Sequence, residues 1–424
     1  METNLDKNQI KHNYTVNVLD GAFYGLATGF ASFGTIIPLF IASMTNSAIL
    51  IGLVPALHNV GWQLPQLFFA RTIGRYTRLK PLLLALTTQD RLPFLVLGLI
   101  AWFLPVIGNR NALILSYIVL IWQGLGSGFA ANPWQNLIGR IIPFQDRATF
   151  FGVQSAAASL LASLGAMVAG YWLKEFSAPT SFAVCFFAAT VAIIISYIFL
   201  ALTRENRISV QTDNLNKTPP FWQEVGQILR RDQNFSWFLA ARILSQFGMM
   251  GMSFYVVYAV RFLGMSGLES GLLTSTLFIT QVISNPLLGR LADLTSRRGV
   301  LLIGMLAAAG AAAIATVAAN PVWFYPVVIL GGISNTAFWT IAIAFSLEFG
   351  KTEREKPIYV GMANTLIAPA GVIAPLLGGW IADKMGYSIT FAVACIFSLL
   401  AGWFFFARVR EPHSMDSIPK GGVI

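Results

Sequence analysis

Several ionisable side chains stand inside long apolar stretches of this sequence: Asp20, His58, the adjacent pair Asp90–Arg91, and Arg242. Ionisable groups within a membrane are rare, and they mark ion relays, gates or internal ion pairs. Asp20 and Arg242 occupy similar depths in their stretches, so we expect them to form a gate or a coupling pair. The alternative is that each bonds to a neighbouring helix.

His58 is the candidate for carrying a proton, because an unperturbed imidazole titrates near neutral pH. The alternative is a hydrogen-bond partner without proton transfer. Asp90 and Arg91 are followed by Leu92 and Pro93. Adjacent residues on a helix point about 100° apart, so the two need not pair with each other. We expect structural roles for both, such as a bond from Arg91 to backbone freed by Pro93 or to a polar partner in a neighbouring span.

The apolar stretches contain no grouping of His, Asp or Glu that resembles a catalytic or metal-binding cluster. The three histidines are His12, His58 and His413, and two of these lie in the terminal tails. The sequence has no glycine-rich phosphate loop with a following lysine, which argues against direct use of ATP. Cys185 and Cys395 lie in apolar stretches, so we expect no disulfide. We therefore expect neither an enzyme nor a bound cofactor or metal.

The composition points to lipid as the main solvent. Of 424 residues, 56% are hydrophobic and 11% charged, and the mean hydropathy is +0.66. Soluble proteins carry about 25% charged residues. The net charge of +10 would indicate nucleic acid in a soluble protein,. Here the basic residues lie in short gaps between apolar stretches, so we expect a lipid bilayer, and no nucleic acid, as the partner.

Twelve apolar stretches are long enough to cross a bilayer, which takes roughly 20 residues of helix,. Helix is expected because unpaired backbone groups in lipid cost several kcal/mol each. The expected spans are 15–43, 48–70, 81–105, 112–139, 148–173, 179–202, 236–262, 268–289, 299–319, 321–348, 358–382 and 387–407.

The distribution of Lys and Arg predicts the orientation. With the N-terminus in the cytoplasm, 22 of the 28 basic residues fall in cytoplasmic segments. The outer loops then hold only Arg110, Lys174, Arg261 and Lys384. Because short cytoplasmic loops carry the excess of basic residues, we expect a multi-pass protein of the cytoplasmic membrane, the inner membrane of a bacterium, with both termini in the cytoplasm. The first 14 residues are polar, so we expect no cleavable signal peptide.

Two short basic segments, 71–78 and 289–298, lie between apolar stretches at corresponding places in the two halves of the sequence. The longest polar segment separates these halves. We expect an N-terminal bundle of six spans over 1–203, a cytoplasmic linker over 204–235, and a C-terminal bundle of six spans over 236–424.

Six spans, a linker and six more, with a basic hairpin after the second span of each half, resemble the major facilitator superfamily of secondary transporters over essentially the whole chain. The family's hairpin motif is Gly-x-x-x-Asp-x-x-Gly-Arg-Arg/Lys. The second segment matches it at Gly289, Asp293, Arg297 and Arg298, with Ser296 in place of the second glycine. The resemblance implies an all-α membrane protein with twelve transmembrane helices in two pseudo-symmetric six-helix bundles.

The first hairpin departs from this motif. It keeps Gly74 and Arg75, but it has Leu67 and Arg71 where the family has glycine and aspartate. In this family the aspartate helps to latch the cytoplasmic side when the transporter faces outward. The departure implies that Asp293 alone supplies the main charge of such a latch, and that Gly289, Arg297 and Arg298 contribute to gating.

The resemblance further implies a central cavity lined mainly by the first, fourth, seventh and tenth spans, with the third span at the periphery. We expect substrate to contact the polar and aromatic residues of the lining spans, namely Tyr24, Gln123, Gln246, Tyr255, Asn335 and Trp339. Asp20 and Arg242 would lie on the cytoplasmic side of this site. Amides and aromatic rings suit a neutral or amphipathic ligand, because an organic phosphate would need a cluster of Arg and Lys.

The leading functional expectation is a monomeric secondary active transporter that moves a small organic solute by alternating access, coupled to H⁺ or Na⁺ or driven by the solute's own gradient. The aromatic lining slightly favours efflux of hydrophobic or amphipathic compounds. The scarcity of acidic groups argues against strong proton-coupled antiport. The alternatives are uptake of a sugar-like or other neutral nutrient, a transport-inactive sensor or binding protein, and a lipid-modifying enzyme.

Overall fold

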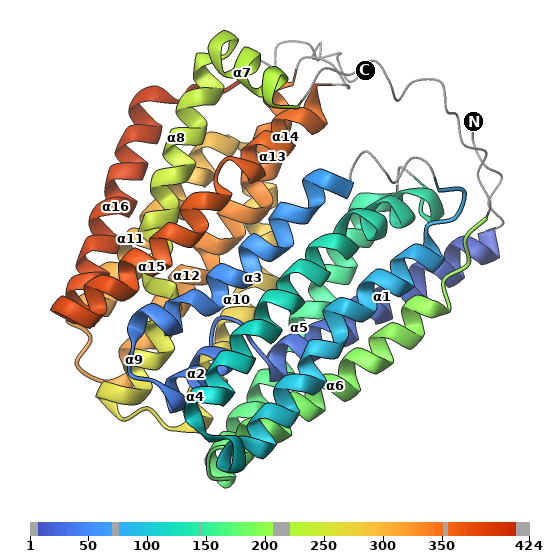
Figure 1. Ribbon diagram of the computed structural model, residues 1–424. Coiled ribbons are helices and arrows are strands. Elements are labelled where there is room, and N and C mark those ends of the chain that lie inside the picture. The colour runs from blue at the N-terminus through green and yellow to red at the C-terminus, as the bar shows by residue number, and fades with distance from the viewer. Residues whose placement is uncertain (1–6, 70–75, 144–145, 207–220, 351–354, 413–424) are drawn as a thin grey trace.

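The computed structural model describes residues 7–69, 76–143, 146–206, 221–350 and 355–412 (Figure 1). Within these ranges nearly every residue is helical and none lies in a strand. Nine helices of the described chain are long and apolar enough to cross a membrane. The architecture agrees with the all-helical membrane fold expected from the sequence.

The first half of the chain forms a set of helices that we call the first group. Its members are α1 (Lys7–Phe30), α2 (Ile36–Met44), α3 (Ala48–Phe69), α4 (Lys80–Ile141), α5 (Arg147–Glu175) and α6 (Thr180–Ala201). The 62 residues of α4 would be roughly 93 Å long as a straight helix, about three times the thickness of a bilayer core,. The chain instead turns at Gly108, whose φ of 78° favours glycine,.

The rest of the chain forms the second group, preceded by the short helix α7 (Phe221–Arg231). Its members are α8 (Gln233–Gly248), η3 (Met249–Ser253), α9 (Tyr255–Leu263), α10 (Gly267–Leu294), α11 (Arg297–Val317), η4 (Pro321–Trp323), α12 (Phe324–Thr336), η5 (Ala337–Ile341), α13 (Ala342–Phe349), α14 (Lys356–Thr365), α15 (Ala368–Met385) and α16 (Tyr387–Arg408). Ser296 caps α11 by accepting a hydrogen bond from the Gly299 amide at 3.1 Å,. This cap gives a physical reason for serine at the motif's glycine position.

Each group packs mainly on itself, and two helix pairs make the most extensive contacts between the groups. Inside the groups, α1 packs on α5 and α6, and α11 packs on α12 and α16. Between the groups, α5 packs on α10 and α3 packs on α15 (Figure 1). A Cβ atom on Gly170 of α5 would lie 2.6 Å from the Cα of Gly271 of α10. The small residues therefore allow the two backbones to touch.

The two ends of the molecule differ in how the groups are joined. We call the end where α1 begins and α7 lies the α7 end, and the opposite end the Asp383 end (Figure 1). Ion pairs described at the α7 end lie within one group, as between Arg140 and Glu205 (3.2 Å) and between Arg297 and Glu348.

At the Asp383 end, a carboxylate of one group caps a helix of the other. Asp383, near the end of α15, accepts hydrogen bonds from the backbone amides of Ala48 (2.6 Å) and Ile49 (3.3 Å) and from the Ser47 hydroxyl (3.1 Å). These amides are the unpaired donors at the start of α3, where a negative charge is also favoured by the helix dipole. We call this contact the Asp383 clamp.

Arg261 adds a second link at the same end. Its guanidinium, at the end of α9, donates to the carbonyl of Thr45 at 2.6 Å and to that of Ala42, both at the end of α2. The Asp383 clamp and Arg261 therefore hold the two groups together at one end, on either side of the loop that joins α2 to α3.

Four of the expected spans are not single regular helices. The span 15–43 is interrupted between α1 and α2, 236–262 by η3, 321–348 by the π-helical turn η5, and 358–382 between α14 and α15. Non-helical backbone at membrane depth is tolerated only where it is buried in protein or lines a cavity. The positions of these interruptions therefore bear on where a ligand can bind.

Candidate functional site

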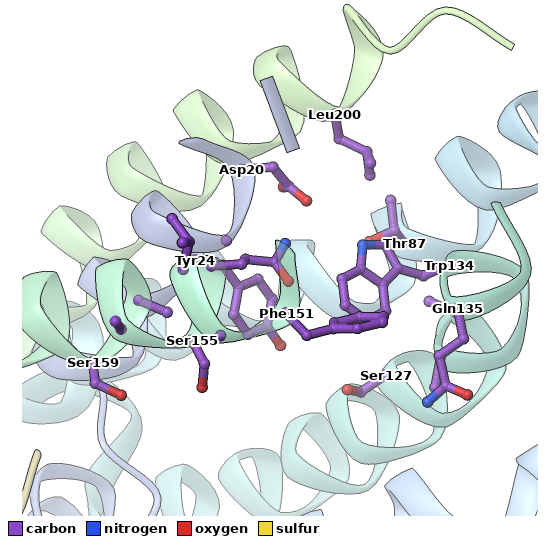
Figure 2. A pocket seen from close by; sticks show the side chains of 18 of the residues that line it. Asp20, Tyr24, Thr87, Ser127, Trp134, Gln135, Phe151, Ser155, Ser159 and Leu200 are labelled. Atoms are coloured by element: carbon purple, nitrogen blue, oxygen red, sulfur yellow. The ribbon is translucent and has the colours of Figure 1, made fainter. Parts of the chain in front are cut away.

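Two cavities lie between the groups. The larger, of about 960 Å³, extends toward the α7 end and is lined mostly by the first group, with a few residues of α10 and η5. We call it the α7-side cavity. Figure 2 shows Asp20 and Tyr24 of α1 and Ser127 and Trp134 of α4 around it. Its exposed wall area is mainly apolar, with the carboxylates of Asp20 and Asp90 among the polar groups that interrupt it.

The smaller cavity, of about 430 Å³, lies deeper, between the α7-side cavity and the Asp383 end. We call it the central pocket. Every one of the four helix interruptions contributes to its wall, through the pocket residues Ser32, Phe33, Gly34, Thr35, Met249, Met250, Met252, Ser253, Phe338, Trp339, Ile367 and Ala368. Discontinuous helices that meet at the middle of a membrane protein are typical of substrate and ion sites.

The interruption at η5 is held by a buried arginine. Arg242 of α8 is 3% exposed and donates to the backbone carbonyls of Phe338 (3.1 Å) and Ala363 (3.4 Å). A π-helical turn disrupts the regular backbone bonding of its helix, and Arg242 ties it to α14. It thereby fixes the position of Trp339, the next residue in the turn.

Three polar atoms in the wall of the central pocket have no hydrogen-bond partner among the described residues. They are the hydroxyl of Thr35, the carbonyl oxygen of Gln63 and the Nε of Arg242. Buried polar atoms are normally satisfied, and an exception needs an explanation such as water or a ligand. These three atoms are themselves buried, so a bound molecule could reach them only after their side chains move.

A pair of tryptophans lies at the boundary of the two cavities. Trp62 of α3 lines the α7-side cavity and Trp339 of η5 lines the central pocket. Their ring centroids are 5.8 Å apart with an interplanar angle of 71°. Because the two residues belong to different groups, their contact depends on how the groups are placed.

A buried hydrogen-bonded chain also connects the cavities. The carboxylate of Asp90 accepts from the Tyr24 hydroxyl (3.2 Å) and from the Gln123 amide nitrogen (2.8 Å). The amide oxygen of Gln123 in turn lies 2.9 Å from Nδ1 of His58. Phe33 stacks on the His58 ring with a centroid distance of 3.9 Å. Asp90 lines the α7-side cavity and His58 lines the central pocket.

Beside this chain lies a buried ion pair. The Asp20 carboxylate accepts from Arg91 (3.1 Å) and from the Ser196 hydroxyl (2.6 Å), and Arg91 also donates to Ser196 and Thr87. Both side chains are less than a tenth exposed. Arg91 thus links α1, α4 and α6, and its partners are polar side chains of neighbouring spans, one of the two structural roles expected for it.

The predicted binding residues fall into three sets: those in the wall of the central pocket, those in the wall of the α7-side cavity, and Gln123, which lies in neither wall. Gln246, Tyr255, Asn335 and Trp339 line the central pocket together with His58 and Arg242. Tyr24 and Asp20 line the α7-side cavity.

Gln123 is in neither wall. It lies 1% exposed behind His58, with both ends of its amide bonded, so its expected contact with substrate needs correction: it reaches the pocket only through His58.

Asp20 and Arg242 do not form the pair expected from their depths. Asp20 bonds to Arg91 in the first group, and Arg242 bonds to backbone carbonyls in the second. The reason is that each has a nearer partner on a neighbouring helix, which was the alternative interpretation of the sequence. Asp90 is the opposite case: we expected a structural role, but it stands in the cavity wall.

The hairpin residues lie at the α7 end. Asp293 is largely exposed and 3.5 Å from Arg297, which also pairs with Glu348. Arg298 donates to the Phe406 carbonyl at 2.6 Å. These contacts are within the second group. A latch to the first group would form only in another arrangement of the groups.

Gly289 has open space where a Cβ would lie, so crowding does not explain the glycine. The corresponding residues of the first hairpin, 71–75, lie outside the described residues, and Leu67 is described only in its backbone.

The sequence pattern of the Major Facilitator Superfamily matches residues 26–262 and 254–422. Multidrug resistance protein 1 of Bacillus subtilis is 27% identical over 36% of this chain and 38% of its own length, and multidrug resistance protein 2 is 28% identical over 38% and 41%. The matched segment thus spans about two fifths of each of these relatives.

Solved structures share the fold at low sequence identity. A bacterial homologue of the human lysosomal transporter Spinster, in an inward-facing and unoccupied conformation, has a TM-score of 0.74 at 14% identity, covering 96% of this chain and 98% of that one. A D-xylose–proton symporter has a TM-score of 0.66 at 17% identity, covering 95% and 99%. A nucleoside transporter has a TM-score of 0.71 at 11% identity, covering 95% and 100%.

Proposed function

Because this chain belongs to the Major Facilitator Superfamily of transporters, we propose that it exports small amphipathic organic solutes by alternating access. The fold class expected from the sequence is thereby confirmed: an all-α membrane protein with the twelve-helix fold of this superfamily. The substrate class, the direction of transport and the coupling ion, H⁺ or Na⁺, are parts of the proposal.

The observation that carries the proposal is the convergence of four helix interruptions on one pocket. Apolar and aromatic side chains make up most of that wall, with a few placed polar groups such as Gln246 and Asn335. Pockets of this kind hold ligands by burying their apolar surface and orienting them through single hydrogen bonds. Gln246 and Asn335 would supply those bonds, and Thr35, Gln63 and Arg242 would add to them only after a movement that exposes their unpaired atoms.

The α7 end is proposed to face the cytoplasm, on the basis of the basic residues that gather there. The structure is then an inward-facing state, joined at its outer end by the Asp383 clamp and Arg261. A solute would enter the α7-side cavity and pass Trp62 and Trp339 to reach the central pocket.

In the opposite state the outer links would be broken. Asp293 would then close the cytoplasmic side as the main charge of a latch, with Gly289, Arg297 and Arg298 in the same hairpin. The moving bodies are proposed to be residues 1–203 and 236–424, connected by the linker 204–235, within a monomer in the cytoplasmic membrane with both termini inside.

Export is favoured over uptake by two observations. The curated relatives include two multidrug resistance proteins. The larger cavity extends toward the proposed cytoplasmic side, and its wall includes the contacting aromatic pair Trp134 and Phe151, whose ring centroids are 5.8 Å apart. Uptake of a sugar or a nucleoside is the competing function, since the structural neighbours include transporters of both kinds.

The test is transport by the purified chain in proteoliposomes under an imposed proton gradient, with a sodium gradient in parallel. The probes are ethidium, D-xylose and uridine. Export of amphipathic solutes predicts ethidium movement that depends on protein and gradient, with neither xylose nor uridine moved. Movement of xylose or uridine alone would establish the uptake alternative, and movement of none of the three would reject the proposed substrate class.

A further inference from the structure

We propose that Asp90 binds the coupling proton, and that Gln123 reports its protonation to the central pocket by reversing its amide and exchanging the tautomer of His58. The role in coupling rests on the proposed function. The structural switch itself does not, because it follows from the hydrogen bonds that join the three residues.

The starting state is set by the bonding capacity of each group. An ionised carboxylate only accepts hydrogen bonds, so Gln123 must turn its NH₂ toward Asp90, as the 2.8 Å contact shows,. The amide oxygen is left facing His58 at 2.9 Å. Nδ1 of His58 must therefore carry the proton, and Nε2 is an acceptor.

Protonation of Asp90 reverses each of these bonds. One proton from water in the α7-side cavity binds the carboxylate, which becomes a donor. The amide of Gln123 then turns its oxygen to Asp90 and its NH₂ to Nδ1 of His58. Nδ1 gives its proton to water and Nε2 takes one from water, so the imidazole stays neutral. The net change is one proton, bound at Asp90.

The guanidinium nearest to Asp90 in the sequence, that of Arg91, is hydrogen-bonded to other side chains. Arg91, its neighbour on α4, is bonded to Asp20 of α1, to Ser196 of α6 and to Thr87. Arg91 also lies 5.4 Å from the ring of Tyr197 on α6.

The described donors on Asp90 are therefore neutral, namely Tyr24 from α1 and both Gln123 and Ser127 from the same long helix α4. The remaining titratable group near the chain is His58 of α3. A carboxylate held by neutral donors alone can take up a proton without breaking an ion pair.

The proton-binding residue and the residue whose tautomer changes lie in the walls of different cavities. Asp90 is in the wall of the α7-side cavity, and His58 is in the wall of the central pocket. Gln123 lies in neither and is 1% exposed. A solute in the pocket would meet an acceptor at Nε2 of His58 before protonation of Asp90 and a donor after it.

The experiment is ¹⁵N NMR of the full chain, labelled with [¹⁵N]histidine, in lipid nanodiscs across pH 5–9. The chain has three histidines, and the His58 signals are those absent from a His58→Gln variant. We expect the Nδ1–H tautomer at high pH and the Nε2–H tautomer at low pH, with both forms neutral. A single tautomer throughout, or direct conversion to imidazolium, would overturn the proposal.

Three variants identify the path of the signal. In Gln123→Leu and in the nearly isosteric Asp90→Asn, the pH-dependent exchange should be lost. In Gln89→Leu the exchange should persist, since Gln89 accepts a hydrogen bond from Trp122 and takes no part in the hydrogen bonds that join Asp90, Gln123 and His58. Persistence of the exchange in either of the first two would contradict the relay. The readout requires no solute, so tautomer exchange without transport would refute only the proposed function.

Discussion

Trp62 and Trp339 meet edge to face across the boundary between the two groups, with ring centroids 5.8 Å apart. An aromatic pair of this geometry contributes about 0.5–1.5 kcal/mol beyond the burial of its area. Such a contact is strong enough to partition two cavities and weak enough to open during a transport cycle. The pair therefore acts as a thin inner gate in this account.

The first prediction concerns this gate. In a chain with Cys185 and Cys395 replaced by Ala, Gln246→Cys in the central pocket should react slowly with a membrane-impermeant maleimide. Adding Trp339→Ala should speed the reaction roughly 2- to 12-fold, the equivalent of losing about 0.5–1.5 kcal/mol. Trp102→Ala, on an exposed side chain of α4, is the matched control. Equal rates with and without Trp339 would show that the pair is no barrier.

The second prediction concerns the arginine that holds the π-helical turn. Arg242→Leu removes the donors to the carbonyls of Phe338 and Ala363. Leaving buried acceptors unpaired costs about 1–3 kcal/mol, so thermal unfolding followed by tryptophan fluorescence should begin at a lower temperature. Arg110→Gln, at an exposed position, should leave the transition unchanged. An Arg242→Leu protein as stable as the parent would mean that the turn needs no such support.

The third prediction concerns the buried ion pair of Asp20 and Arg91. Asp20→Leu or Arg91→Met alone leaves a buried charge without its partner, which costs about 3–5 kcal/mol. The double variant removes both charges and should recover much of that loss. Unfolding of the four proteins in denaturant, compared as a double-mutant cycle, measures the coupling. Additive losses would show that Asp20 and Arg91 do not depend on each other.

The sequence was sufficient for the fold and for placing four side chains in one pocket wall. Long apolar stretches and the distribution of basic residues predict membrane helices, because the bilayer imposes both. Gln246, Tyr255, Asn335 and Trp339 were found because polar and aromatic groups on lining spans must face a cavity or a neighbour.

The helix interruption and the position of Asp90 depend on tertiary contacts, which cannot be inferred from the pattern of apolar residues along the sequence. The interruption at η5 is stabilised by Arg242, a side chain distant in the sequence. Asp90 was expected to be structural because the resemblance places the third span at the periphery, whereas Asp90 stands in a cavity wall, bonded to Tyr24 and Gln123. The sequence signal that could have indicated this position was the presence of Tyr24 and Gln123, a hydroxyl and an amide, on two other spans.

The fourth prediction follows from the links at the Asp383 end. Asp383→Asn weakens the cap on α3, a contact of about 0.5–2 kcal/mol, and Arg261→Gln removes the bonds to Ala42 and Thr45. The double variant should open the Asp383 end and shift the population toward the state closed at the α7 end. The same substitutions leave the central pocket intact, since neither residue lines it.

The most direct test of alternating access is double electron–electron resonance, which measures the distance between two spin labels. Two label pairs are placed in the full chain, again with Cys185 and Cys395 replaced. One label pair, at Lys11 and Leu294, reports on the α7 end, and the other, at Val106 and Val322, reports on the opposite end. Freeing the Asp383 end with Asp383→Asn and Arg261→Gln should shorten the first distance and lengthen the second. If both distances stay the same or change in the same direction, the two groups do not alternate and the account is contradicted.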